Sequence, residues 1–459
     1  MIYVEQIENY IWIRKQFKDV HLPDTRLINR LEGLACRMMA KPNLSIPKQN
    51  REWKDIKAAY RFYDSDKVHF SELIQPHINQ TKKMAKKRRQ ILAIQDTCHI
   101  SYSHHNSVKD LSDMGGENGS KGIILHSCLA VDPNKKHPEI LGLLDQYIHH
   151  RTKKIDKNET YSQRQKRWRE SKLWEESSQR SDIKDSGIQI IEVMDREGDA
   201  FDIIKNCISL GHDFVIRAVN NRLLNNSKED KLFDLVSNLK PAGQIVLDIR
   251  KRPQQIPRKA KLDVGFSKIE IKCPKSRKNE IIECNIVHVI EKDPPEEQEP
   301  LEWLLLTSVE VNSFEDACQI IEWYKCRWII EEYHKGIKTG CNVEKKQLKT
   351  GKRLENFLGL ANIVALRLLK LRDVARNMPE ISAKKIIDPL KVDILIKYNE
   401  INKEDITIYE YCREVAKIGG FIGRKSDGEP GWQSLWEGEI ELTKLFEGAK
   451  LMMKNKIYG

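Results

Sequence analysis

Two short apolar segments, each ending in an aspartate, constrain the fold of this chain more than any other feature. Residues 90–97 read QILAIQDT and residues 188–195 read IQIIEVMD, so Asp96 and Asp195 each follow a run of aliphatic side chains. Runs this short and this apolar are typical of strands that are buried on both faces of a sheet. A helical pattern at 200–210 follows the second run, and another apolar run follows at 213–219. This alternation predicts a mixed α/β sheet.

The pattern changes between about residues 236 and 310. Several short strand-like runs follow one another there, linked by segments rich in Pro, Lys and Arg, and a long helix is expected from about Ser313. We interpret this stretch as a compact, mostly antiparallel β insertion. The expected organisation is a helical region at 1–75, an α/β core at 76–375 that carries the insertion, and a helical region at 376–459.

The N-terminal region shows helical periodicity, and Asp24 is placed to cap its first clear helix. Arg26 and Arg30 lie one turn apart on this helix, and Arg61 lies on a second helical segment. The spacing therefore places cations on the surface of this region.

The chain is basic, with 79 Lys and Arg residues against 67 acidic ones and a net charge of +12. A surplus of this size favours a polyanionic partner, with nucleic acid ahead of an anionic membrane. Six cations fall between residues 82 and 89. This run is interpreted equally well as a solvated helix face or as a set of phosphate contacts. No segment is long and apolar enough to predict a membrane span, and the N-terminus does not have the pattern of a secretory signal.

The strand-end aspartates suggest chemistry. If the two strands are parallel neighbours, Asp96 and Asp195 lie close together, and paired carboxylates repel each other unless a cation lies between them. Mg²⁺ is the cation that such oxygen ligands prefer. The alternative is that each aspartate simply caps the turn that follows its strand.

A third element strengthens the first interpretation. Tyr324, Arg327, Glu331, Lys335 and Lys338 follow one another at intervals of 3, 4, 4 and 3 residues, which places them along one stripe of a helix. A carboxylate flanked by cations and a phenol suits a metal-bound phosphodiester, because Arg and Lys hold phosphate oxygens. The alternative is ordinary i,i+4 ion pairing, Arg327 with Glu331 and Glu331 with Lys335.

These residues carry a specific resemblance. The sequence resembles the DDE transposases of the bacterial insertion-sequence family IS-four, the Tn-five-like transposases, whose signature is Tyr-x2-Arg-x3-Glu-x6-Lys. Here that signature reads Tyr324, Arg327, Glu331 and Lys338 with every gap kept, and LAIQDT and Asp195-Arg196-Glu197 match the segments around the two family aspartates. Shorter matches are AYRF (59–62), EWLLLTS (302–308), GGF (419–421) and LWEG (435–438).

The resemblance implies an RNase H-like catalytic core with a β insertion, an N-terminal domain that binds transposon ends and a C-terminal dimerisation domain. It implies that Asp96, Asp195 and Glu331 bind two Mg²⁺ ions per active site, with Asp96 bridging both, and that Mn²⁺ substitutes. The implied partners are the double-stranded DNA of transposon ends and target, and a second copy of the chain once two ends are paired. The implied location is the bacterial cytoplasm, in association with the nucleoid.

The family chemistry is cut-and-paste transposition through a hairpin intermediate. A hairpin requires an extruded base, and the resemblance assigns Trp303 to stack it, with Arg217 nearby and Tyr324, Arg327 and Lys338 on the adjacent phosphates. Lys335 is assigned to DNA as well, and Arg26, Arg30 and Arg61 to end recognition. From its apolar neighbours alone, Trp303 would instead be a core residue.

Two other functions remain open at this point. One is an RNase H-like nuclease that cleaves without strand transfer, and the other is a non-catalytic regulator that occupies DNA ends. Loss of any of the three acids would favour the regulator, and all three are present.

Overall fold

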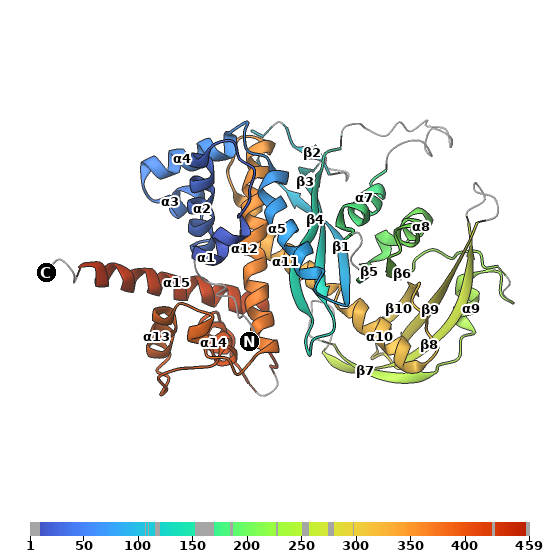
Figure 1. The fold of residues 1–459 in the computed structure, drawn as a ribbon. Coiled ribbons are helices and arrows are strands. Elements are labelled where there is room, and N and C mark those ends of the chain that lie inside the picture. The colour runs from blue at the N-terminus through green and yellow to red at the C-terminus, as the bar shows by residue number, and fades with distance from the viewer. Residues whose placement is uncertain are drawn as a thin grey trace.

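The computed structural model describes residues 10–105, 107–108, 110–114, 120–151, 169–183, 187–225, 228–249, 257–273, 280–296, 298–424 and 427–455. Helices gather on one side of the molecule and a large twisted sheet on the other (Figure 1). The helices of the N-terminal region are α1 (Tyr10–Gln16), α2 (Thr25–Ala40), α3 (Ile46–Asn50), α4 (Trp53–Asp64) and α5 (Phe70–Ala85). Asp24 caps α2 as predicted, since its carboxylate accepts the Arg26 N–H at 2.8 Å.

Within the described residues, ten strands form one mixed sheet, which confirms the predicted fold class. Its order is β2-β3-β1-β5-β6-β10-β9-β8-β7, with β4 paired to β3. The strands are β1 (Gln90–Ser101), β2 (Ser112–Asp113), β3 (Lys121–Asp132), β4 (Glu139–His149), β5 (Gln189–Met194), β6 (Asp213–Arg217), β7 (Gly243–Ile249), β8 (Arg258–Lys272), β9 (Ile281–Glu291) and β10 (Glu302–Thr307). The strands β1, β5 and β6 run parallel to one another.

The antiparallel insertion is present, but its strands extend the core sheet and do not form a sheet of their own. Strand β10 pairs antiparallel with β6 of the core on one side and with β9 on the other. Continuous pairing of this kind satisfies backbone groups that a free sheet edge would expose.

Two of the short strand-like runs that the insertion contains are KLDVGF (261–266) and KIEIK (268–272). They form the single strand β8, because Gly265, Phe266 and Ser267 all keep their partners on β9 and no turn interrupts the ladder. The local sequence did not reveal this, because pairing with a neighbouring strand decides whether a Gly-containing segment turns or continues.

Strand β5 is buried on both faces, as its apolar run predicts. Ile191 and Val193 of β5 belong to the core that also contains residues of α11 (Trp328–Lys335) and α12 (Gly351–Asn377). Met194 belongs to a second core with residues of α7 (Lys172–Ser181) and α8 (Phe201–Leu210). A strand enclosed in this way holds its backbone rigidly, which suits it to carry functional side chains.

The long helix expected from Ser313 is broken. It forms α10 (Phe314–Lys325), a turn at Cys326 and Arg327, then α11, and it ends in a π-helical turn, η2 (Gly336–Gly340). Ser313 begins it with a capping box shared with Asp316. The five residues of the predicted stripe are therefore distributed over two helices and a π-turn, and π-turns occur frequently at functional sites.

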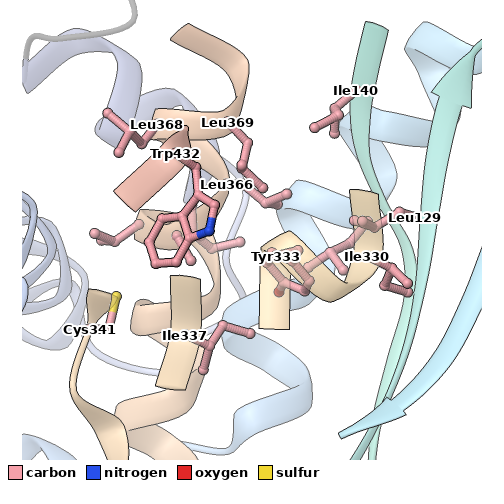
Figure 2. Packing of buried hydrophobic residues seen from close by; sticks show 14 of the residues in the cluster. Leu129, Ile140, Ile330, Tyr333, Ile337, Cys341, Leu366, Leu368, Leu369 and Trp432 are labelled. Atoms are coloured by element: carbon pink, nitrogen blue, oxygen red, sulfur yellow. The ribbon is translucent and has the colours of Figure 1, made fainter. Parts of the chain in front are cut away.

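The apolar side of α11 anchors this segment. Figure 2 shows Ile330 and Tyr333 between Leu129 and Ile140 of the sheet and the leucines of α12. Ile330 and Tyr333 have no exposed surface. Because this face is packed, Glu331, which follows Ile330, lies beside the buried face and keeps its carboxylate partly exposed.

The remaining elements complete the fold. They are α9 (Leu232–Ser237), α13 (Pro389–Tyr398), α14 (Ile408–Ile418), α15 (Trp432–Asn455) and the 3₁₀ turns η1 (Arg196–Gly198), η3 (Val343–Lys345) and η4 (Ala383–Lys385). The C-terminal part of α15 projects away from the body of the molecule (Figure 1). Among the described residues, no helix has the length and apolar character that crossing a bilayer requires.

Candidate active site

The two aspartates are brought together by strand register. Strand β1 pairs in parallel with β5 from Gln90 opposite Gln189 to Ile94 opposite Val193, and two steps further the same register matches Asp96 with Asp195. The sequence suggested that Asp96 lies at a strand end, but this was wrong. Strand β1 continues past Asp96 to Ser101, because it pairs with β3 over that length. It lies just past the point where its parallel neighbour β5 stops, so its environment opens there.

Asp96 has contacts with Thr97 and His334. One carboxylate oxygen accepts the Thr97 N–H at 2.8 Å, and Oδ2 lies 3.6 Å from Nδ1 of His334. Burial alone would raise the pKa of Asp96, but His334, the Thr97 amide and the charge of Arg327 outweigh it and lower that pKa below its ordinary value. The carboxylate is therefore ionised and ready to bind a cation.

Asp195 is in a different electrostatic environment. Its Oδ1 accepts the Glu197 N–H at 2.8 Å, so Asp195 does cap the 3₁₀ turn that follows β5. Burial and, more weakly, the charge of Asp96 raise the pKa of Asp195. The pKa of Glu197 is also raised, by burial and then by Asp195 and Asp96. Capping and participation in a cluster of repelling acids thus coexist at Asp195.

Glu331 lines the same hollow as Asp96. This open cleft of about 600 Å³ is bordered by Asp96, Thr97, His99, Glu197, Glu331, His334, Lys335, Lys338 and Glu344. The carboxylate of Glu331 is 38% exposed and is paired with the Arg327 guanidinium one turn earlier. The first i,i+4 ion pair considered from the sequence is therefore formed.

The two lysines of the predicted stripe, Lys335 and Lys338, have other contacts. The Lys335 ammonium lies 5.5 Å from the centroid of the Trp432 ring. Lys338 donates to the His99 carbonyl at 2.9 Å and lies 3.4 Å from a carboxylate oxygen of Glu344. Both lysines still border the cleft, so their charges add to its positive side.

An aromatic group lies beside the acids. The Trp303 and Tyr324 rings meet edge to face at 5.5 Å, and the Arg217 guanidinium donates to the Glu302 carbonyl at 2.8 Å. Trp303 is 8% exposed and Tyr324 is 3% exposed. Burial raises the pKa of the Tyr324 phenol and lowers that of Arg217. In this conformation Trp303 packs as a core residue, and Tyr324 is one of the residues in contact with its ring.

The N-terminal arginines lie in another part of the molecule. Arg26 and Arg30 are on α2 and Arg61 is on α4, where Arg26 and Arg61 are exposed and Arg30 is half-buried. None of the three borders the cleft of Asp96 and Glu331.

Several residues of the cleft were not assigned from the sequence, and Glu197, His334 and Glu344 are the most notable of them. Glu197 and Glu344 border it, and His334 contacts Asp96. Glu197 stands two residues after Asp195, and His334 stands three after Glu331 on the same helix. The second spacing is the available signal, since i,i+3 residues share a helix face. Glu344 comes from η3 and is placed only by the tertiary structure.

The donor set suits divalent oxygen-seeking metals. Asp96, Asp195 and Glu331 supply carboxylates, and burial together with the weaker effect of the Asp96 charge raises the pKa of Asp195. In the described residues, no three Asp, Glu, His or Cys side chains are already arranged around one ion position. Glu331 is directed to Arg327, so binding a metal would require it to exchange this partner.

Comparison with known families gives three matches along the chain. Residues 10–68 match the family model for a transposase DNA-binding domain. Residues 190–367 match the model for a transposase DDE domain, and residues 363–457 match the model for the Tn5 transposase dimerisation domain. The first match contains the three N-terminal arginines, and the second contains Asp195, Trp303 and the whole signature from Tyr324 to Lys338.

Proposed function

The chain belongs to the Tn5-like DDE transposases, and on that basis we propose that this DNA transposase works by cut-and-paste, using Asp96, Asp195 and Glu331 as its catalytic acids. It would nick a transposon end to free a 3′-hydroxyl, cleave through a hairpin and join the hydroxyl to target DNA.

One observation carries this proposal. The parallel register of β1 and β5 matches Asp96 with Asp195, and Glu331 borders the cleft that Asp96 borders. Asp96 and Glu331, which are far apart in the sequence, thus border one cleft that Lys335 and Lys338 also border, while Asp195 does not line this cleft and is matched to Asp96 by register. A phosphodiester needs such a combination, because carboxylates hold divalent cations while lysines and arginines contact phosphate oxygens.

We assign the metal role by chemistry. Asp96, Asp195 and Glu331 would hold two Mg²⁺ ions, or Mn²⁺ in their place, and these would activate the attacking oxygen and neutralise the leaving one. Arg327 would then be released from Glu331 to contact phosphate, as would Lys335 and Lys338. The ion pair between Arg327 and Glu331 is in this view a resting arrangement of both side chains.

The aromatic group supports the hairpin step. Trp303 and Tyr324 are adjacent, and Arg217 lies next to them at the end of β6. We propose that Trp303 stacks an extruded base, which would require Tyr324 to move from its edge-to-face position. Arg26, Arg30 and Arg61 would contact the transposon end, and the C-terminal domain would pair two subunits on two ends. The reaction would take place on the nucleoid DNA of a bacterial cytoplasm.

The test uses the purified chain, Mg²⁺ and a duplex that carries the terminus of its own element. Wild-type protein should release a 3′-hydroxyl at the end, whereas Glu331→Ala should bind the same duplex with nearly unchanged affinity and produce no nick. Glu322→Ala is the matched control, because Glu322 is an exposed acid on α10 paired with Lys325, and it should nick normally. Nicking by Glu331→Ala would refute the assignment of Glu331.

Adding a target duplex separates the other candidates. Joined products identify a transposase, nicked ends without joining identify a nuclease, and binding without any cleavage identifies a regulator. The last two outcomes would overturn the cut-and-paste proposal.

A further inference from the structure

A group of exposed cations lies at the far end of strand β1 from Asp96. We name it the basic ridge; it consists of Lys83, Lys86, Lys87 and Arg89 from the end of α5 and the turn into β1, and of Lys135 and Lys136 from the turn between β3 and β4. All six side chains are exposed. Two segments, the turn from α5 into β1 and the turn from β3 into β4, therefore place positive charge at the same end of these strands.

The ridge borders two open hollows. One, of about 540 Å³, is lined by Lys87, Arg88, Arg89 and Lys135 together with polar residues, and the other, of about 520 Å³, by Lys82, Lys83, Lys86 and Arg180 together with polar residues. Acids in both hollows already have partners. Asp132 is 2.9 Å from Arg88, and Asp182 is 3.3 Å from His212.

The six ridge cations differ from the neighbouring cations Lys82 and Arg88, which have partners within the protein. Lys82 donates to the carbonyls of Arg180 and Asp182, and Arg88 pairs with Asp132 and Glu139. Within the described part of the chain, no carboxylate is paired with any of the six. Their mutual repulsion is therefore not offset inside this part of the molecule.

An ordinary helix terminus does not account for the ridge. Cations in the last turn of a helix are stabilised by its dipole, and this explains Lys83 and Lys86 at the end of α5. It does not explain Lys135 and Lys136, which come from a turn between two strands. Convergence of separate segments favours an external polyanion.

The position of the ridge indicates its role. Gln90 begins β1 and Asp96 lies six residues later, so at about 3.3 Å per residue the ridge lies roughly 20 Å from the acids. A duplex advances about 3.4 Å per base pair, so this separation corresponds to about six base pairs. Lysines contact phosphates as point charges and read no sequence.

We infer that the basic ridge binds the phosphate backbone of duplex DNA without sequence preference, as a contact separate from the catalytic cleft. The inference rests on the proposed function, because it takes DNA as the substrate. Two duplexes offer the same chemistry: the DNA that flanks the cleaved end, and the target.

The test replaces Lys83, Lys86, Lys87 and Arg89 together by Gln. The control replaces four exposed lysines of the C-terminal region, Lys385, Lys397, Lys403 and Lys417, by Gln. Binding to a duplex of unrelated sequence is measured without divalent metal at several salt concentrations. Each lost phosphate contact lowers the slope of log K against log salt by about 0.9, so the ridge variant should lose about 3–4 in slope and at least about ten-fold in affinity. The control should change less than about two-fold.

Two further duplexes distinguish the DNA sources. If the defect appears only when the end duplex extends at least about six base pairs past the cleavage position, the ridge holds flanking DNA. If it appears only in joining to a separate duplex, the ridge holds target. Either result supports the inference.

Unchanged slope and affinity of the ridge variant on every duplex would overturn the inference. So would a defect confined to vesicles containing phosphatidylserine, which would assign the ridge to a membrane surface. Nicking of the end duplex by wild-type protein is recorded in parallel. If it fails, the proposed function fails, and this result is independent of the salt slopes.

Discussion

The imidazole of His334 joins the candidate metal ligand Asp96 to the sheet behind it. Its Nδ1 lies 3.6 Å from Oδ2 of Asp96, and its Nε2 lies 3.2 Å from Oγ of Ser127 on β3. Ser127 is also the residue opposite Asp96 in the β1–β3 ladder, so His334 links the Asp96 carboxylate to the strand that pairs with β1. Such contacts orient a metal-binding carboxylate before the metal arrives.

His334→Ala should therefore weaken metal binding by about 10–100-fold, the usual effect of removing a group that orients a ligand. Calorimetric titration with Mn²⁺ measures this directly, without DNA. His334→Gln, which keeps a donor, should recover part of the affinity, and His21→Ala, an exposed histidine outside the cleft, should change nothing. Equal Mn²⁺ affinities of wild type and His334→Ala would show that the contact has no such role.

Arg327→Gln separates a phosphate contact from a metal ligand. The substitution removes the partner that holds Glu331, so Mn²⁺ affinity should stay the same or rise. Nicking should nevertheless fall by at least about ten-fold, because a cation that would contact the phosphate is lost. Lys325→Gln is the control, as Lys325 is a half-buried cation that pairs with Glu322 one turn earlier. A fall in both Mn²⁺ affinity and nicking would place Arg327 in support of the metal site instead.

Asp195→Asn should stabilise the metal-free protein while abolishing nicking. A carboxyl whose pKa is higher in the folded than in the unfolded state binds its proton more tightly when folded, so stability falls as pH rises from about 4 through the folded pKa. Removing the charge removes this loss. The melting temperature should thus rise at pH 7.5, by roughly 1–3 °C, and the gain should disappear below about pH 4.

Thermal unfolding at several pH values, without divalent metal, measures this effect. Asp248→Asn, at an exposed position on β7, should show no comparable pH-dependent gain. If Asp195→Asn is less stable than wild type at pH 7.5, the capping bond to Glu197 outweighs the repulsion between the acids.

Trp303→Phe tests the base-stacking proposal while keeping most of the packing. Trp303→Ala would be unsuitable alone, since loss of a buried aromatic side chain costs about 3–5 kcal/mol. The Phe variant should nick ends at a normal rate but form or open hairpins at least about five-fold more slowly, because a smaller ring stacks a base less well. The fluorescence of 2-aminopurine at the extruded position reports stacking. Normal hairpin kinetics together with normal quenching would leave Trp303 as a core residue only.

Much of the site could be predicted because its signals are local. The apolar runs before Asp96 and Asp195 predicted buried strands, and the spacing from Tyr324 to Lys338 singled out the segment that borders the cleft. The roles given to all of the site residues stay predictions, those of the three acids included. His334 and Glu344 escaped assignment, because their contacts with the site depend on elements distant along the chain.

The sequence by itself determined which apolar segments are buried, where the cations accumulate and which acids follow apolar runs, because hydrophobic burial and charge act through short-range patterns. Only the tertiary structure decided that β1 and β5 pair in the register that matches Asp96 with Asp195, that β8 continues through Gly265, and that Glu331 pairs with Arg327. These outcomes depend on contacts between residues far apart in the chain, where several partners compete for each backbone group and each charge. A local sequence pattern does not determine which of these partners is bound in the folded protein.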